Sequence, residues 1–522
     1  MKKIDEMEYL KLSKWKKFLY RFVSFFAAIP RKLLDGIIGI GRFFKNLGLA
    51  IYNELKDIVM TFIRGDWKTK TSYGIMGFGS IARGQILRGI LFFLFEVVFI
   101  FYMFFAQLIN KDGSNGAYWL RMLGSLGLKE PRNLEVLVNG SDTVHISIPG
   151  DNSFRILLYG VLTIFFVIAF IYTWRANIKQ NKIAEEILKT GKPLRSGKDD
   201  LRSLVDDNFH TTLLALPLTG ILVFTVMPII FMILVAFTNY NAAKNDGVNN
   251  ALFHWVGFEN FKTLFSWDVK GVNYSATFGE ILSWTLIWAF FATFTNYFLG
   301  IFVAMMINKK GIKLKKLWRT ILILTIAIPQ FISLLYVSRM FSLNGLVNGA
   351  LKSLGIVKHS IDFWGTPSLA RVMVIIINIW IGIPYLMLIA TGILMNIPAD
   401  LYESSKIDGA SGWKQFSKIT LPYMLFITGP YLLTSFTGNM NNFNVIYLLT
   451  GGGPTNAARS GASGNVGYTD LLITWLFKIT TTGESKYYLA SVVGILVFVV
   501  VALISLIVYN VLPSVKNEED FQ

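Results

Sequence analysis

The stretch YESSKIDGASGWKQFSKITLP, residues 402–422, is polar and charged, yet it separates two long apolar runs of the chain. The run VMVIIINIWIGIPYLMLIATGIL (372–394) precedes it, and YMLFITGPYLLTSF (423–436) follows it. Apolar runs of this kind are long enough to enter or cross the roughly 30 Å hydrocarbon core of a membrane. We therefore predict a structured loop at a membrane surface, with Gly409 at its centre and Pro422 at its exit.

The rest of the chain repeats this alternation of apolar and polar segments. The 522 residues are 53% hydrophobic and 16% charged, which excludes a disordered chain and disfavours a soluble domain. Buried helices of a soluble core would show shorter apolar windows with polar stripes between them. Apolar windows of about 20 residues instead predict an all-α membrane protein with eight transmembrane helices, at 89–109, 154–174, 212–238, 282–306, 317–339, 370–394, 422–446 and 488–511.

The formal net charge of +18 follows the loops between these helices. Lys and Arg are concentrated in the first 88 residues and in the loops 175–209 and 308–319, whereas the loops 239–281 and 340–369 contain few of them. This alternation is the positive-inside pattern, which predicts that both termini and the 402–422 stretch are cytoplasmic. Because the charge reflects topology, we do not expect nucleic acid as a partner.

Residues 1–88 are predicted to form a basic, cytoplasmic extension. Aromatic and aliphatic residues alternate there with Lys and Arg at helical spacing, which indicates an amphipathic helix in the membrane interface, broken near Pro30. Two roles remain open: a membrane anchor or partner dock, and a poorly specific extension that merely binds anionic headgroups. The first two transmembrane helices occupy 89–209. Their external segment, 110–153, contains NLEVLVNG and TVHISIP around an Asn-Gly turn, which predicts a small β-hairpin.

Few residues point to catalysis or metal binding. The chain has no cysteine, and its four histidines lack the spacing of metal ligands, so we expect neither a metal nor another cofactor. The segment GKPLRSGKDD (191–200) lacks the spacing of a phosphate loop, so this chain is not expected to be an enzyme that hydrolyses ATP. Glu96 is the one charged residue well inside a predicted span. It is either functional, or a carboxyl group that is protonated or packed against a helix.

The 402–422 stretch resembles the cytoplasmic EAA loop of binding-protein-dependent ABC importer permeases. The resemblance rests on Glu403-Ser404-Ser405, three residues, Gly409, nine residues, and Ile419-Thr420-Leu421-Pro422, with Ser-Ser in place of Ala-Ala as the one departure. In that family the loop inserts into an ATPase subunit. The residue types suit this role, because small residues allow close approach and Gly409 permits a turn that a Cβ would obstruct. We also expect Pro422 to stop one helix and start the next, and Glu403 to remain free for a basic residue of the partner.

From about His210 onward the chain is similar to the larger permease subunit of the maltose/maltodextrin ABC importers. The similarity is carried by NIWIGIPYLM (378–387), IPADLYE (397–403), NMNNFNVIYLLTGGGP (439–454) and GYTDLLITWLFKI (467–479). It implies a type I ABC importer permease fold, with a core at 210–515 and the coupling loop at 401–422. The enteric members carry a large external domain between their third and fourth spans. Here the loop 239–281 is short and the N-terminus is long and basic, which resembles the Gram-positive version.

The resemblance also implies a sugar site in the middle of the membrane, on the sixth and seventh spans. Its residues are Asn378, Ile381, Gly382 and Tyr385, together with Ser435, Asn439 and Asn442. Independently, the spacing of the polar residues within each group places them on one face of a helix. Amide groups suit sugar hydroxyls, and a tyrosine ring can stack on a pyranose. The alternative is that these amides only join helices to one another.

The function implied is that of a permease subunit that imports maltose and maltodextrins across the bacterial cytoplasmic membrane. Its implied partners are a second, smaller permease subunit, two ATPase subunits, an external lipid-anchored sugar-binding protein and the bilayer itself, with ATP hydrolysed on the separate ATPase subunits. A permease for another oligosaccharide, such as a raffinose-type sugar, is the alternative within this class. A secondary carrier or a membrane-embedded enzyme is the alternative outside it. Neither alternative outside the class would need the EAA loop, and a carrier would show inverted repeats and paired intramembrane charges.

Overall fold

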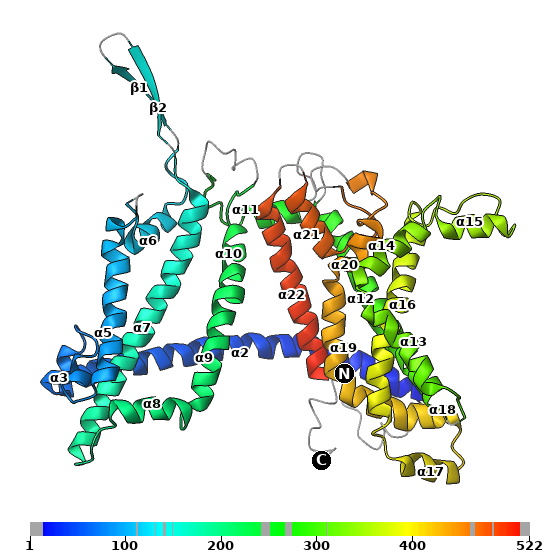
Figure 1. Ribbon diagram of the computed structural model, residues 1–522, viewed down its shortest axis with the longest axis horizontal. Helices are drawn as coiled ribbons and strands as arrows, with labels where there is room; N and C mark the ends of the chain where they lie inside the picture. The colour runs from blue at the N-terminus through cyan, green and yellow to red at the C-terminus, as the bar shows by residue number, and fades with distance from the viewer. Residues whose placement is uncertain are drawn as a thin grey trace. The chain divides into compact units, whose positions relative to one another are not determined.

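The computed structural model is a largely helical protein that divides into two compact units (Figure 1). Unit 1 comprises residues 1–120 and 160–221, and unit 2 comprises residues 121–159 and 222–522. The structure describes residues 14–110, 113–130, 132–138, 142–148, 150–241, 251–266, 274–309, 311–459, 465–482 and 485–511.

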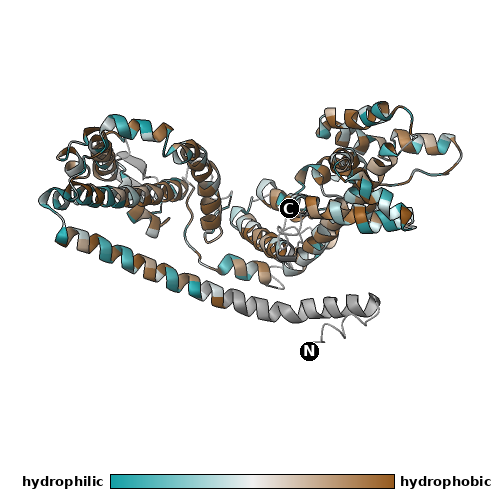
Figure 2. Ribbon diagram, turned by 90° about the horizontal axis from the view of Figure 1, so that it is seen from below, coloured by the Kyte–Doolittle hydropathy of each residue, from teal (hydrophilic) through white to brown (hydrophobic). Residues whose placement is uncertain are grey.

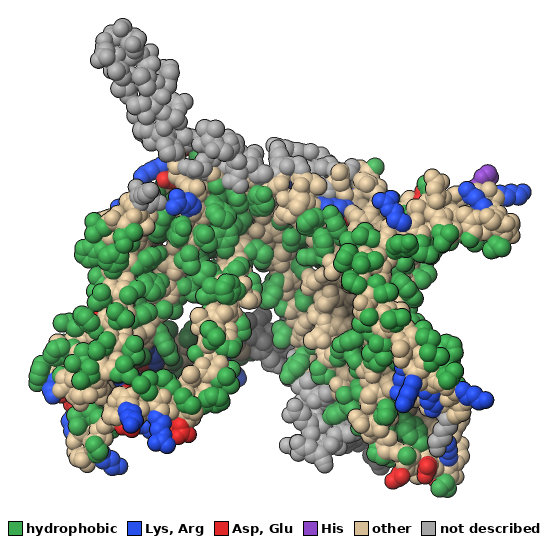
Figure 3. Space-filling model, in the orientation of Figure 1, with side chains coloured by type: hydrophobic (Ala, Val, Ile, Leu, Met, Phe, Trp, Pro, Cys, Tyr) green, Lys and Arg blue, Asp and Glu red, His purple; other side chains and the backbone are tan. Residues whose placement is uncertain are grey.

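Seven continuous helical segments among the described residues are long and apolar enough to cross a membrane. Hydrophobic side chains cover the flanks of these helices in each unit, and the charged side chains gather beyond their ends (Figure 3). This distribution confirms the prediction of a multi-pass membrane protein. The helices are α5 (Ile86–Ile100), α7 (Ser153–Lys189), α9 (Phe209–Ile221) with α10 (Met227–Val235), α12 (Tyr274–Asn308), α16 (Pro367–Leu394), α19 (Leu421–Met440) with α20 (Phe443–Thr450), and α22 (Tyr487–Val511).

The fifth predicted span, 317–339, is not one straight helix. It consists of α13 (Lys315–Ala327) and α14 (Gln330–Met340), whose axes differ in direction by 91°. The break falls at Ile328 and Pro329, both of which have extended ψ angles. A proline disfavours the helical conformation of the residue before it and lacks the N–H that would continue the ladder. The prediction of eight spans therefore holds only if this bent pair is counted as one.

The predicted β-hairpin is confirmed as two antiparallel strands in unit 2. Strand β1 (Arg132–Val138) pairs with β2 (Asp142–Ile148), with Arg132 opposite Ile148 and Val138 opposite Asp142. The Asn-Gly dipeptide of the predicted turn lies outside the described residues.

The N-terminal amphipathic helix is confirmed, but its predicted break near Pro30 is wrong. Helix α2 (Lys14–Arg64) continues past this residue without interruption. A proline already has a helical φ angle and removes a single hydrogen bond, so the intact turns on both sides hold the helix together.

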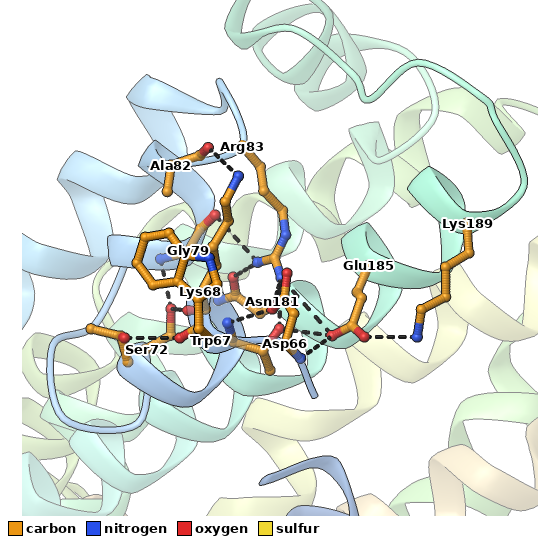
Figure 4. Close-up of polar contacts among 12 residues, drawn as sticks. Asp66, Trp67, Lys68, Ser72, Gly79, Ala82, Arg83, Asn181, Glu185 and Lys189 are labelled. Atoms are coloured by element: carbon orange, nitrogen blue, oxygen red, sulfur yellow. Dashed lines mark hydrogen bonds and ion pairs between the residues drawn. The ribbon is translucent and has the colours of Figure 1, made fainter. Parts of the chain in front are cut away.

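After α2 the chain folds into a small cluster around Arg83, which joins two short helices to α7 (Figure 4). The short helices are α3 (Trp67–Thr71) and α4 (Phe78–Ile81). The guanidinium group of Arg83 is 1% exposed and donates to Asp66 at 2.5 Å and to Asn181 of α7 at 2.7 Å. It also donates to Thr69 at 2.7 Å. Burial alone would raise the pKa of Asp66, but hydrogen bonds from Thr69 and the charge of Arg83 hold it below its ordinary value.

Replacing Arg83 with alanine is expected to destabilise unit 1 by about 1–3 kcal/mol, because the buried side-chain oxygens of Asn181 and Thr69 lose their donor. The matched control is Arg42→Ala on the exposed surface of α2. Thermal unfolding of the purified chain in detergent should show a lower Tm for Arg83→Ala than for Arg42→Ala. Equal Tm values for the two variants would contradict the structural role of this cluster.

The core of unit 2 is organised around α12, which packs against both α16 and α19. Two glycines permit this close packing. A Cβ on Gly300 would lie 2.6 Å from the Cβ of Leu386, and a Cβ on Gly382 would lie 2.5 Å from Nδ2 of Asn296. Small residues at such points let transmembrane helices approach each other closely. The predicted site residues of α16 and α19 therefore lie beside a third helix, α12.

Candidate functional site

Of the residues predicted on α16, Asn378 and Gly382 lie against α12, whereas Tyr385 points outward. Asn378 is buried, and its carbonyl oxygen accepts a hydrogen bond from Nδ2 of Asn296 at 3.5 Å. Gly382 faces the same amide group. Tyr385 is 51% exposed, and its ring centroid lies 6.3 Å from that of Tyr431 on α19.

The predicted residues of the seventh span do not share one continuous helical face. Helix α19 ends at Met440, and Asn442 is the N-cap of α20, where its side chain accepts from the N–H of Val445 at 3.2 Å. Asparagine is favoured at helix ends because its amide competes with the backbone for hydrogen bonds. The interrupted helix still keeps Asn442 next to Asn439, since Nδ2 of Asn442 lies 3.4 Å from Oδ1 of Asn439. Ser435, which is partly buried, lies one turn earlier on α19.

Helix α12 supplies polar partners that the sequence analysis missed. Nδ2 of Asn439 donates to Oγ1 of Thr293 at 3.0 Å, and Nε1 of Trp288 donates to the carbonyl oxygen of Asn439 at 3.0 Å. Asn296, one turn beyond Thr293, donates to the carbonyl oxygen of Asn378. The sequence could have predicted these residues, because Thr293 and Asn296 lie three residues apart inside an apolar span, where unpaired polar groups are costly.

One side-chain oxygen in this arrangement is left open. Oδ1 of Asn296 is buried and has no hydrogen-bond partner among the described residues. A buried acceptor without a donor is costly, so a mobile donor such as a water or a hydroxyl group is expected there. Asn296 thus contacts the polar face of α16 and retains an unused acceptor beside Gly382.

A cavity of about 310 Å³ lies where α16 passes the break between α13 and α14. Two predicted site residues, Ile381 and Tyr385, line it together with Trp380. Gln330 and Ser333 add polar groups from the beginning of α14. A cavity of this size is at the lower end of the range found for small-molecule sites. The structure therefore divides the predicted residues into two groups, one lining this cavity and one packed around α12.

The predicted coupling loop, residues 401–422, forms a compact turn between helices. It contains the end of α17 (Ala399–Ile407) and α18 (Gly412–Gln415). Ser405 accepts a hydrogen bond from Nε2 of Gln415 at 2.8 Å, and the hydroxyl of Tyr402 lies 2.8 Å from that of Thr420. Ser404 donates to the carbonyl oxygen of Asp400 at 2.8 Å. The hydroxyl groups of Ser404 and Ser405 thus stabilise the loop. The side chain of Glu403 is exposed.

Gly409 adopts the turn conformation that the sequence predicted, whereas Pro422 does not end a helix as expected. Gly409 has a φ of 73°, in the left-handed region that a Cβ disfavours, and no atom of another residue lies within 4 Å of the position of its Cβ. Pro422 does not separate two helices. A π-helical turn (Phe416–Thr420) joins α18 to α19, so the chain is helical from Gly412 to Met440. The π turn shifts the hydrogen-bond register, which accommodates a residue without an N–H group.

The segment LLTGGGPTN (448–456) packs against the GYTDLL motif, where the hydroxyl of Thr469 donates to the carbonyl oxygen of Gly453 at 2.6 Å. The carboxylate of Asp470 is fully buried and accepts from the N–H of Gly467 at 2.7 Å and from Nζ of Lys478 at 2.7 Å. A Cβ on Gly452 would lie only 1.8 Å from its Oδ1. Gly452 is therefore needed for close packing against a buried ion pair.

These features define a class of protein: a multi-pass membrane protein with polar residues buried among its helices and a structured loop at their ends. Residues 296–517 match the family model described as binding-protein-dependent transport system inner membrane component.

Curated relatives match most of the chain. The maltodextrin transport system permease protein MalC of Streptococcus pneumoniae is 31% identical over 85% of this chain and 95% of its own length. The galactooligosaccharides transport system permease protein GanP of Bacillus subtilis is 32% identical over 85% of this chain and 97% of its own. The maltodextrin transport system permease protein MdxF of Bacillus subtilis is 32% identical over 85% and 95%. The chain belongs to the family of binding-protein-dependent transport system inner membrane components.

Proposed function

We propose that this chain is the larger permease subunit of an ABC importer for maltose and maltodextrins. Its partners in this proposal are a second, smaller permease subunit, two ATPase subunits that hydrolyse ATP, and an external sugar-binding lipoprotein. The distribution of Lys and Arg supports a topology with both termini in the cytoplasm. Two of the three relatives described above carry maltodextrin in their names, which supports the choice of sugar.

The helical segment from Gly412 to Met440 is the observation that carries this proposal. It begins in the coupling loop and ends one residue after Asn439, which contacts α12. A helix of this length spans about 40 Å, so a displacement at the loop is transmitted along a rigid rod to the polar residues. Closure of the ATPase pair moves the loop, and the helices around α12 then open their polar site to the opposite side of the membrane. This sequence of events is alternating access.

In this proposal the sugar contacts the residues named from the resemblance. Asn378, Gly382 and Asn439 lie beside α12, and Asn296 adds an acceptor for a hydroxyl group. Tyr385 lines the adjacent cavity, where its half-exposed ring can stack on a pyranose. Glu403, exposed at the coupling loop, pairs with a basic residue of the ATPase subunit.

A permease for galacto-oligosaccharides is the second candidate, because GanP is as similar to the chain as the maltodextrin permeases are. Both functions use the same fold and coupling loop, so only the preferred sugar separates them.

The test is ATP-dependent uptake of labelled maltotriose into vesicles that contain the assembled importer. Uptake should resist unlabelled galacto-oligosaccharides and raffinose as competitors and should fall by more than about tenfold in Asn439→Ala, because that variant loses its contacts with Thr293 and sugar. Asn441→Ala, which changes an exposed residue at the end of the same helix, is the matched control. Transport of galacto-oligosaccharide without transport of maltotriose would reject the maltodextrin proposal and retain the permease.

A further inference from the structure

Helix α2 of unit 1 carries a stripe of large apolar side chains that the structure leaves uncovered. Bands of hydrophobic and hydrophilic residues alternate along its coloured part (Figure 2). The stripe consists of Phe44, Leu47, Ile51, Leu55 and Phe62, which are 63%, 43%, 52%, 57% and 47% exposed. Their spacing of three, four and seven residues places them on one face of the helix.

The opposite face of α2 is mainly polar. Asn46, Asn53 and Lys56 are exposed there, roughly half a turn of the helix away from the stripe, and Leu49 is an exposed apolar side chain among them. A helix with one apolar and one polar face needs a boundary between an apolar and an aqueous medium. The contacts between α2 and α7 show at what depth in the membrane α2 lies.

The contacts with α7 place α2 at the end of the apolar part of that helix. Glu54 forms an ion pair with Arg175, and Asp57 forms one with Lys182 at 2.5 Å. The apolar run of α7 ends at Trp174, whose indole N–H donates to the carbonyl oxygen of Tyr73 at 3.0 Å. Since the apolar run crosses the hydrocarbon, α2 lies level with the membrane surface, and Figure 1 shows that it crosses α7 rather than following it.

The same two ion pairs show which way the stripe faces. Around the axis of α2, the side chain of Glu54 lies about 60° from that of Asp57. Asp57 contacts Lys182, whereas Glu54 contacts Arg175, which lies about 10 Å nearer the apolar half of α7. The stripe lies about another 60° around the axis in the same direction. The stripe therefore faces the apolar half of α7.

The other side of α2 confirms this orientation. Met60 and Arg64, which lie on the polar side of the helix, line a cavity of about 230 Å³ with Glu186 and Lys189 at the far end of α7. The polar side thus faces away from the apolar half. The hydroxyl of Tyr73 also donates to the carbonyl oxygen of Ile58 at 2.6 Å, which holds α2 in register.

The Arg83 cluster prevents α2 from turning about its own axis. The N–H of Asp66, two residues beyond the helix, donates to Oε2 of Glu185 at 3.1 Å. The carboxylate of Asp66 in turn holds Arg83, which contacts Asn181 (Figure 4). The end of α2 is thereby attached to α7 at several points.

We propose that α2 is an interfacial helix, held by its contacts with α7 so that the Phe44–Phe62 stripe inserts among the phospholipid chains of the leaflet in which the Arg175 end of α7 lies. Phospholipid is the occupant because the stripe faces the part of α7 that phospholipid surrounds. The proposal depends on the membrane topology and not on the sugar that is transported.

The absence of cysteine allows a direct test on the full-length chain in lipid nanodiscs. A fluorophore is attached to single cysteines introduced as Leu47→Cys and Ile51→Cys on the stripe, and as Asn46→Cys and Asn53→Cys on the polar face. Fluorescence is then quenched with nitroxide-labelled phospholipid or with aqueous iodide. The proposal predicts several-fold stronger lipid quenching at 47 and 51 than at 46 and 53, and the reverse order for iodide.

Three results would overturn the proposal. Iodide quenching at all four positions would show that α2 lies in water. Protection of positions 47 and 51 from both quenchers would show that protein covers the stripe. Equal lipid quenching at all four positions would show that α2 has no fixed orientation. Each variant is first checked for an unchanged elution volume in size exclusion, so that a misfolded chain is not scored.

Discussion

Replacing Gly382 with valine is expected to lower the rate of sugar uptake by about tenfold or more, since overpacking a tight contact costs about 1–3 kcal/mol. A Cβ at this position would lie 2.5 Å from Nδ2 and 2.7 Å from Cγ of Asn296. This amide is held by hydrogen bonds to the carbonyl oxygens of Ala292 and Asn378, at 2.8 and 3.5 Å. The added side chain therefore pushes α12 and α16 apart at the proposed sugar site.

The matched control for this prediction is Gly392→Val on the same helix. Both glycines lie inside α16, so the two variants share the change in helix propensity, but no atom lies within 4 Å of a Cβ on Gly392. Maltotriose uptake should be near the wild-type rate in Gly392→Val and strongly reduced in Gly382→Val, at equal amounts of assembled protein. Equal uptake by the two variants would show that the close approach of α12 and α16 does not matter for transport.

Replacing Glu403 with arginine is expected to abolish transport without disturbing the fold of the chain. The side chain of Glu403 is exposed, and no hydrogen bond or ion pair of this side chain occurs among the described residues. Its role is therefore expected to lie in a contact with the ATPase subunit, and breaking a desolvated charge pair from one side costs about 2–5 kcal/mol. The measurement is the amount of ATPase subunit that copurifies with the chain, together with ATP-driven uptake.

Asp400→Arg is the control for this charge reversal. Asp400 is also exposed and lies in the first turn of the same helix, α17, so the change in charge is identical. Copurification and uptake should be retained in Asp400→Arg and lost in Glu403→Arg. If Glu403→Arg assembled and transported normally, the assignment of the coupling loop would be wrong.

Two exposed apolar residues flank Gly409 in the predicted coupling loop. Ile407 and Trp413 are 88% and 75% exposed. Large exposed apolar side chains are common at protein–protein contacts, so we expect both residues to contribute to the contact proposed for Glu403.

The sequence left two roles open for Glu96, a functional residue or a packed one, and the structure shows what its side chain contacts. It is buried, and its carboxylate accepts a hydrogen bond from the N–H of Met76 at 2.7 Å. The preceding loop is itself held by Asn177, which accepts from the N–H of Gly77 at 3.0 Å. The contact with Met76 therefore supports the packed role for Glu96. Nothing in the sequence around Met76 predicted this contact.

The sequence by itself determined the class of fold, most of the spans, the hairpin strands and the turn at Gly409. These features depend on local properties: the length of an apolar run, the alternation of a strand, and the left-handed conformation at Gly409. Each can be predicted from a short window, because neighbouring residues alone decide it.

The tertiary structure alone decided the contacts between distant segments. The contribution of Thr293 and Asn296 to the polar site depends on α12 packing between α16 and α19. The 91° bend at Pro329 and the uninterrupted helices at Pro30 and Pro422 could not be told apart from the sequence, because a proline can either end a helix or be accommodated within it. The direction of the α2 stripe depends on ion pairs with residues more than a hundred positions away. The spacing of residues in the sequence shows which side chains share a helix face. Only the tertiary packing determines which helix, cavity or lipid that face contacts.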